Sequence, residues 1–250
     1  PEQGIVIQPW LSVSGSGLGS ASLNIVYVIF TFLFQNNIES INSLDGGLTI
    51  NGPVILQSVF PFIPGPLKFL LGPRSSYVGG TLHAVWYDDD AVPPPSGSFF
   101  VMMSQSTNNG NSWTTFAPIA NPPELVPIFK PLSGNFIWPT YWPDIASEAG
   151  TSMVYVIFGL GFAPALFPFN HLDLALIYDT DADLTTGANQ FLQFPFPNPQ
   201  QFNSANLWFA SVATQASDGT VHVAFADETS AIGVLGFPNI YALIAFQYVY

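Results

Sequence analysis

Short apolar runs rich in β-branched and aromatic residues alternate along the whole chain with clusters of Gly, Pro, Asn and Asp. Apolar runs of this length, bounded by turn-forming residues, are typical of β-strands. The 3.6-residue period of an amphipathic helix is nearly absent. The pattern therefore predicts an all-β protein.

Four of these runs form an internal repeat, in which a Tyr or His is followed three residues later by an aromatic residue. The repeated position holds Tyr27, His83, Tyr155 and His222. A second predicted strand follows each copy, and another precedes most copies. Repeats at a spacing of tens of residues indicate an architecture built from similar units, such as a propeller. We expect a packed, hydrogen-bonded role for the two histidines, with metal ligation as the alternative.

A polar turn follows the trailing strand in three of the four copies. The turns are SLDGGLTI (43–50), STNNGNSW (106–113) and DTDADLTT (179–186). They resemble the Asp-box, S-x-D-x-G-x-[ST]-[WF], of the sialidase-like β-propellers, which is also called a BNR repeat. Ile50 replaces the aromatic residue in the first turn, and Asn108 replaces the Asp in the second. The third turn is a degenerate copy.

The resemblance implies that these turns join the third and fourth strands of a blade, on the outer rim and away from the ligand-binding face. The Asp or Asn side chain is expected to cap backbone N–H groups, and Gly to take a positive φ. A terminal Trp would fill the gap between neighbouring sheets. The residues expected to have these structural roles are Ser43, Asp45, Gly47, Thr49, Ser106, Asn108, Gly110, Ser112 and Trp113.

The four copies predict one all-β domain over residues 1–250, a β-propeller of about four blades. The repeats are expected at about 9–60, 75–130, 141–200 and 207–250. The fourth copy ends at its third strand, and residues 2–8 form a strand without a blade of its own. We therefore expect the N-terminal strand to complete the last blade, because ring closure removes free sheet edges. A part of a larger ring, or an open β assembly, is the alternative.

The charge balance excludes several classes of partner. The chain has 16 acidic residues and only three basic ones, Lys68, Arg74 and Lys130, which gives a formal net charge of -13. Nucleic-acid binding needs clustered Lys and Arg, so no nucleic-acid partner is expected. No uninterrupted apolar run approaches the ~20 residues of a membrane-spanning helix. A first residue of Pro and an acidic, Lys-poor composition favour an extracellular or cell-surface protein whose secretion signal has been removed.

Candidate carbohydrate chemistry rests on a few aromatic and acidic residues. Sialidases of the family that the turns resemble hold the substrate carboxylate with three arginines, whereas Arg74 is the only arginine here. Sialidase activity is therefore disfavoured. A general glycosidase needs two carboxylates about 5 to 10 Å apart, and no signature marks such a pair. The candidate ligand-binding residues are Trp86, Trp138, Tyr141, Trp142 and Asp144.

Calcium is the one cofactor that the sequence suggests, at Asp179, Asp181 and Asp183. These residues start like an EF-hand loop, but Leu184 stands where the loop requires Gly, and Gln190 stands where it requires Glu. The alternative interpretation is a degenerate Asp-box whose extra carboxylates face water.

Three functions follow from these patterns. Apolar, Pro-rich segments at 60–73, 91–97, 119–129 and 194–202 are either rigid connectors that pack on the rim or docking surfaces. The first hypothesis is therefore a secreted, non-enzymatic structural or adhesive surface protein that assembles with copies of itself into a filament, tube or coat. The second is a lectin-like propeller that binds glycans, with or without Ca²⁺. The third is a glycoside hydrolase-like enzyme.

Overall fold

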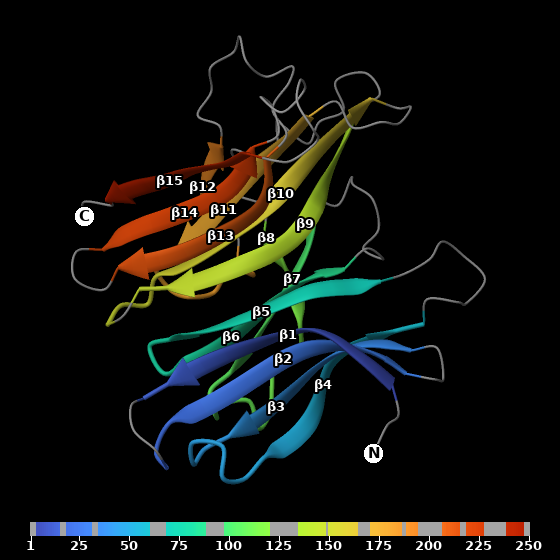
Figure 1. Ribbon diagram of the computed structural model, residues 1–250, viewed down its shortest axis with the longest axis vertical. Helices are drawn as coiled ribbons and strands as arrows, with labels where there is room; N and C mark the ends of the chain where they lie inside the picture. The colour runs from blue at the N-terminus through green and yellow to red at the C-terminus, as the bar shows by residue number, and fades with distance from the viewer. Residues whose placement is uncertain are drawn as a thin grey trace.

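A computed structural model describes most of the chain (Figure 1). The described residues are 4–15, 19–31, 35–60, 69–88, 98–120, 135–148, 150–164, 171–186, 189–194, 207–215, 219–227 and 239–247.

Four antiparallel sheets contain all the strands of these residues, and none of the described residues is helical. The first sheet consists of β1 (Gly4–Ser14), β2 (Ser22–Thr31), β3 (Asn36–Ser43) and β4 (Asn51–Val59). The second consists of β5 (Leu70–Val78), β6 (Thr81–Asp88), β7 (Ser98–Ser106) and β8 (Ala117–Ala120). The third consists of β9 (Asn135–Ser147), β10 (Val154–Pro164), β11 (His171–Asp179) and β12 (Gln190–Phe194). The fourth consists of β13 (Leu207–Gln215), β14 (Thr220–Asp227) and β15 (Asn239–Gln247).

The sheets are arranged like consecutive propeller blades (Figure 1). Within each sheet the strands follow their order in the chain, and the first strands of successive sheets contact one another: β1 with β5, β5 with β9, and β9 with β13. We call these four first strands the inner strands. A buried apolar cluster lies between each pair of consecutive sheets, and the three clusters contain Trp86, Phe158 and Tyr155 respectively. The predicted all-β fold with a propeller-like repeat is confirmed.

The predicted ring closure by residues 2–8 is wrong for the described part of the chain. Gly4–Ile7 pair with β2 and continue through a bulge into the rest of β1, so they belong to the first sheet and not to the last. Among the described strands, β13 makes no extensive contact with β1, and the four sheets form an open arc. The sheets span 4–59, 70–120, 135–194 and 207–247, against predicted repeats at 9–60, 75–130, 141–200 and 207–250.

The strand register also corrects the first copy of the repeat. Leu23 pairs with Ser43 at the start of the first turn, and Leu82 pairs with Ser106 at the start of the second. Asn24, and not Tyr27, is therefore the counterpart of His83. The error arose because Tyr27 has an aromatic residue at the expected spacing. The strand pairing shows that the true counterpart of His83 lies three residues before Tyr27.

The first two Asp-box turns have the same hydrogen-bond pattern. Ser43 Oγ accepts the Gly47 N–H (2.8 Å), and Asp45 Oδ1 accepts the Thr49 N–H (2.9 Å). In the second turn Ser106 Oγ accepts the Gly110 N–H (2.7 Å), and Asn108 Oδ1 accepts the Ser112 N–H (2.9 Å). These side chains satisfy the backbone of each hairpin, so their predicted structural role is the one that the contacts support.

The Asp/Asn exchange between these turns reverses one hydrogen bond. The Thr49 hydroxyl donates to Asp45 Oδ2 (2.6 Å), whereas Asn108 Nδ2 donates to the Ser112 hydroxyl (2.8 Å). A hydroxyl group can donate or accept, so either residue completes the turn. Hydrogen bonds from Thr49 and Ser43 lower the pKa of the exposed Asp45 carboxyl to about 2.

Each later turn packs on the preceding sheet. Trp113 packs against the apolar cluster between the first and second sheets, as its predicted role requires. A Cβ atom on Gly110 would lie 2.5 Å from Asn24 Nδ2, and Asn42 Nδ2 donates to Asn111 Oδ1 (3.3 Å). In the third turn the backbone carbonyl of Ala182 accepts a hydrogen bond from Gln105 Nε2 (3.2 Å). The turns therefore connect neighbouring sheets as well as neighbouring strands.

Substitution of Gly110 by Ala is expected to destabilise the fold by about 2–4 kcal/mol, because strain at positive φ adds to the clash with Asn24. Gly80 has nearly the same φ (89° against 87°) but open space where a Cβ would lie, so Gly80→Ala isolates the backbone strain and should cost about 1 kcal/mol. Urea unfolding of the two variants measures both values. Equal losses would show that the contact with the first sheet does not matter.

Candidate functional site

A bulge interrupts each inner strand at an equivalent place. The register shifts lie between Ile7 and Trp10 in β1, between Leu71 and Arg74 in β5, and between Trp208 and Ser211 in β13. In β9 the pairing shifts between Tyr141 and Asp144. A proline immediately precedes the residue that resumes pairing in the first three sheets, as in QPW, GPR and WPD. Proline has no N–H for a ladder, and a bulge tolerates this loss.

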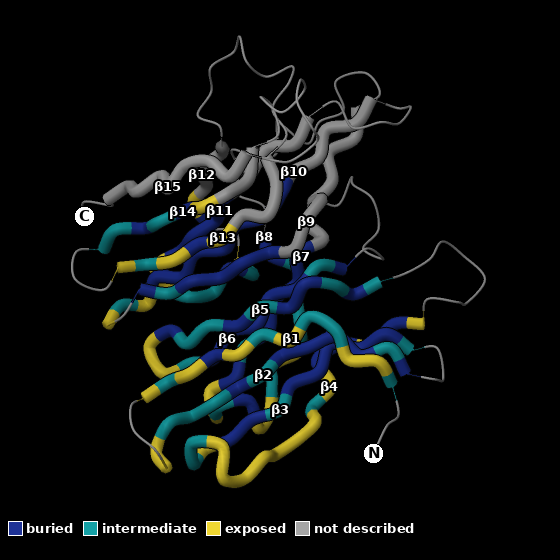
Figure 2. The backbone as a smooth tube through the Cα atoms, in the orientation of Figure 1, coloured by how far each residue is buried: buried dark blue, intermediate teal, exposed yellow. Residues whose placement is uncertain are grey.

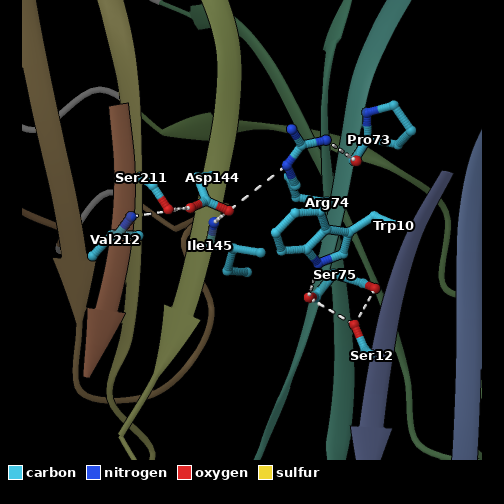
Figure 3. A network of polar contacts seen from close by, with 9 residues as sticks. All are labelled: Trp10, Ser12, Pro73, Arg74, Ser75, Asp144, Ile145, Ser211 and Val212. Carbon is cyan, nitrogen blue, oxygen red and sulfur yellow. Dashed lines mark hydrogen bonds and ion pairs between the residues drawn. The ribbon is translucent and has the colours of Figure 1, made fainter. Parts of the chain in front are cut away.

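The four residues that follow the bulges contact one another in a row from sheet to sheet (Figure 3). The Arg74 guanidinium lies over the Trp10 ring, 4.4 Å from its centroid to Cζ. On its other side, Arg74 Nε lies 3.8 Å from Asp144 Oδ1. Asp144 Oδ2 accepts the Ser211 hydroxyl (2.6 Å). This row, Trp10–Arg74–Asp144–Ser211, crosses all four sheets, and we call it the inner row.

Asp144 is buried and fully engaged. Its Oδ2 also accepts the Val212 N–H (3.0 Å), and Oδ1 accepts the N–H of Ile145 (3.0 Å). Three donors in addition to the arginine satisfy the oxygens of this buried side chain. Asp144 therefore fastens β13 to β9 and fixes the position of Arg74.

The Arg74 guanidinium keeps a donor group, Nη2, without an acceptor among the described residues. Its side chain is 20% exposed, and Nη1 donates to the Pro73 carbonyl (2.9 Å). Burial lowers the pKa of Arg74, and the Asp144 carboxylate opposes this effect, so the guanidinium stays charged. No described residue accepts a hydrogen bond from Nη2. A guanidinium held between a Trp ring and a carboxylate is well placed to bind an oxygen of a ligand.

The candidate ligand-binding residues predicted from the sequence do not gather at one place. Trp86 is fully buried between the first and second sheets, where its Nε1 donates to Gln57 Oε1. It does not face solvent, so its assignment as a sugar-stacking residue is corrected. The backbones of Trp138, Tyr141 and Trp142 lie in β9, where Trp138 pairs with Gly161 and Tyr141 with Gly159. Ligand binding by these three residues stays a prediction.

The carboxylates of the third turn mostly bind its own backbone. Asp181 Oδ1 accepts the Asp183 N–H (2.8 Å), and Asp183 Oδ1 accepts the Thr185 N–H (3.0 Å). Asp179 is buried, and its Oδ2 has no hydrogen-bond partner among the described residues. In the described ranges, no group of three or more His, Cys, Asp or Glu residues is arranged to hold a metal ion. Calcium binding at Asp179, Asp181 and Asp183 stays a prediction.

His83 is buried beneath the third turn. Burial lowers its pKa to about 4, although the Ala182 backbone and the Asp183 carboxylate act in the opposite direction. Its Nδ1 has no hydrogen-bond partner in the described part of the chain. His222 is partly exposed and lies 3.3 Å from Gln215 Oε1 through Nε2. The packed role expected for His83 agrees with its burial.

Trp10, Arg74 and Ser211 were not predicted from the sequence as neighbours of Asp144. A signal was present, because the x-Pro-x pattern recurs at Pro9, Pro73 and Pro143 before the inner-row residues. The sequence pattern does not predict a strand at GPRSSYV in the second sheet. Without this strand, the proline that precedes each inner-row residue does not stand out as a repeat.

The fold resembles that of solved sialidases. The match to the Hadza microbial sialidase Hz136 covers 88% of this chain and 42% of the sialidase chain, with a TM-score of 0.51 and 15% sequence identity. The match to a Trypanosoma rangeli sialidase in complex with 2,3-difluorosialic acid covers 89% of this chain and 34% of the sialidase chain, with a TM-score of 0.49 and 11% identity. The match to the xylan β-1,4-xylosidase of Bacillus halodurans C-125 covers 90% of this chain and 38% of the xylosidase chain, with a TM-score of 0.43 and 10% identity. No protein-family model matches the chain, and no curated protein matches its sequence.

The chain has a sialidase-like propeller fold. The resemblance drawn from the Asp-box turns is confirmed at this level, and the chain spans less than half the length of the solved proteins described above. At this identity the match establishes the fold alone.

The comparison overturns the first functional hypothesis, a non-enzymatic structural protein that assembles through apolar loops. The Hadza microbial sialidase Hz136, whose fold this chain resembles, is an enzyme and not a filament, tube or coat protein. The segments on which that hypothesis depended lie largely outside the described residues, at 61–68, 91–97, 121–129 and 195–202. No helix among the described residues is long and apolar enough to cross a membrane.

His83 is expected to make the fold sensitive to mild acid. Its folded pKa lies below the unfolded value of 6.5, so the unfolded chain binds more protons between pH 6.5 and 4, and stability falls as the pH falls through this window. The loss should reach about 2 kcal/mol at pH 5. His83→Asn, which copies Asn24, should remove this part of the pH dependence in urea unfolding between pH 7.5 and 5. His222→Asn is the matched control and should keep it, and identical profiles for His83→Asn and the parent would contradict the assignment.

Proposed function

We propose that the chain binds carbohydrate at the inner row, as part of a glycoside hydrolase-like propeller. The observation that carries this proposal is the arrangement of Arg74, whose Nη2 has no acceptor among the described residues while Trp10 and Asp144 fix its plane. An arginine fixed in this way loses little conformational entropy when it binds a hydroxyl or carboxylate oxygen of a sugar. The sialidase-like fold supports the ligand class, because a shared fold raises the prior for glycans without deciding the function.

The inner strands contact one another in series from β1 to β13, and ligands of β-propellers bind at the region that the inner strands line. Arg74 is the ligand-contacting residue in this proposal, and Asp144 is a positioning residue. An extracellular location is part of the proposal, supported by the acidic, lysine-poor composition.

Hydrolysis of a glycosidic bond is the second candidate function, and Asp144 is the observation that favours it. It is the only carboxylate in β1, β5, β9 and β13. A glycosidase needs a second carboxylate about 5 to 10 Å away, which must come from outside the inner strands. Binding is therefore the simpler proposal, since it needs no second acid.

Arg74→Met is expected to weaken glycan binding about 10- to 100-fold, because it removes the charged donors and keeps a long unbranched side chain beside Trp10. A glycan array identifies the strongest glycan for the parent protein, and titration calorimetry then compares the variants. Asp45→Asn is the control, since it changes the same amount of charge at a rim turn and reproduces Asn108. Binding of equal strength by Arg74→Met, or an array without any signal for the parent, would contradict the proposal.

Asp144→Asn separates the two candidate functions. If the protein hydrolyses glycosides through Asp144, release of 4-nitrophenol from a panel of nitrophenyl glycosides should fall by at least about 100-fold in this variant. Circular dichroism checks that the variant is folded. Turnover that is unchanged in folded Asp144→Asn, or absent in the parent, would eliminate hydrolysis by this residue and leave binding as the function.

A further inference from the structure

One face of the first sheet is uncovered among the described residues. The residue after each inner-row position shows the difference most clearly. Ser75, Ile145 and Val212 hold this position in the later sheets, and they are 3%, 4% and 5% exposed because they face the preceding sheet. Leu11 holds the same position in β1 and is 56% exposed.

The first Asp-box turn shows the same contrast. Leu184 of the third turn is completely buried in the cluster between the second and third sheets, whereas its counterpart Leu48 is 80% exposed. Trp113 of the second turn packs against the preceding sheet, whereas its counterpart Ile50 is 61% exposed. Figure 2 shows exposed residues along β1 and around the turn between β3 and β4.

These residues are large and apolar, and at least one later sheet uses the counterpart of each to contact its predecessor. A face that stayed in water would have no need for Leu or Ile at these positions, and exposed apolar groups that gather on one face mark an interface. We propose that the outer face of the first sheet, formed by Leu11, Leu48 and Ile50, is the docking surface for one further propeller blade. This inference rests on the fold and goes beyond the proposed carbohydrate binding.

The existing interfaces define the chemistry of the partner. It is an antiparallel sheet whose second strand offers apolar side chains to Leu11. Opposite the turn at Gly46–Leu48 it carries a pair of polar hydrogen-bonding side chains, as Asn24 and Asn42 do for the second turn. His83 and Gln105 hold the same two positions against the third turn. The new interface would continue the series of three interfaces already present.

The fourth sheet is not this partner in the arrangement observed. β13 contacts β9, and the fourth sheet lies at the opposite end of the arc from the first (Figure 1). The matched sialidase Hz136 also extends well beyond the part that these four sheets cover. A blade outside the four sheets therefore fits the surface best.

Hydroxyl-radical footprinting with peptide-resolved mass spectrometry tests the proposal. It compares the 250-residue chain with the protein isolated from its natural source. Leu11, Leu48 and Ile50 should be labelled rapidly in the 250-residue chain and at least tenfold more slowly in the natural protein. Ile145 should be protected in both samples. Equal labelling of the three residues in both samples would overturn the proposal.

Paired substitutions identify the occupant. Leu11→Asp combined with Leu48→Asp should leave the melting temperature of the 250-residue chain unchanged and should expose the face to labelling in the natural protein. Ile5→Asp is the control, because Ile5 is an equally exposed apolar residue of β1. Cross-links from the Leu48 region to β14 or β15 would assign the face to ring closure, and a dimeric mass lost in the double variant would assign it to a second copy. Either result would overturn the proposal of a further blade.

Discussion

Packing between consecutive sheets is the interaction on which the rest of this structure depends. The sheets of this chain carry apolar side chains on their faces, and burial of these side chains against a neighbouring sheet stabilises the fold. The clusters that contain Trp86, Phe158 and Tyr155 supply this burial. The register of every strand then follows, because a shift by one residue would exchange the faces that meet.

The polar contacts are organised around this packing. Trp10, Arg74, Asp144 and Ser211 occupy one position in four successive units, and three different kinds of interaction join them in series. A chain with a single arginine has placed it where a buried carboxylate and an indole ring both contact it. Such a residue orients neighbouring sheets, and in the proposed function it is also the group that contacts the ligand.

The sequence was sufficient for the fold class and the turns, because both depend on local chemistry. Ser106, Asn108 and Gly110 make their hydrogen bonds within five residues, so the motif in the sequence is also the motif in space. Asp144 was selected from the sequence, but its partners Arg74 and Ser211 are about 70 residues away along the chain. No local pattern specifies such a contact, and only the alignment of four bulged strands brings it together.

The failed predictions have the same physical origin. Trp86 was considered a ligand residue because Trp is common in sugar sites, yet its strand lies between two sheets and its ring fills the core. Tyr27 was placed in the repeat by its spacing to an aromatic residue, whereas the pairing of Leu23 with Ser43 makes Asn24 the counterpart of His83. The low charge of the chain suggested an assembly protein. A low charge indicates only that part of the surface is covered, and it does not identify the partner that covers it.

The prolines at the bulges have a further consequence for colloidal behaviour. The inner strands are the first strands of their sheets, so one edge of each has no ladder partner within its sheet. An unpaired edge is a template on which a foreign strand can grow, and acidic apolar chains near their isoelectric point are prone to such growth. Pro9, Pro73 and Pro143 remove a donor and bend the strand at the middle of this edge. The same kink that aligns the inner row therefore also protects the protein against amyloid-type strand addition.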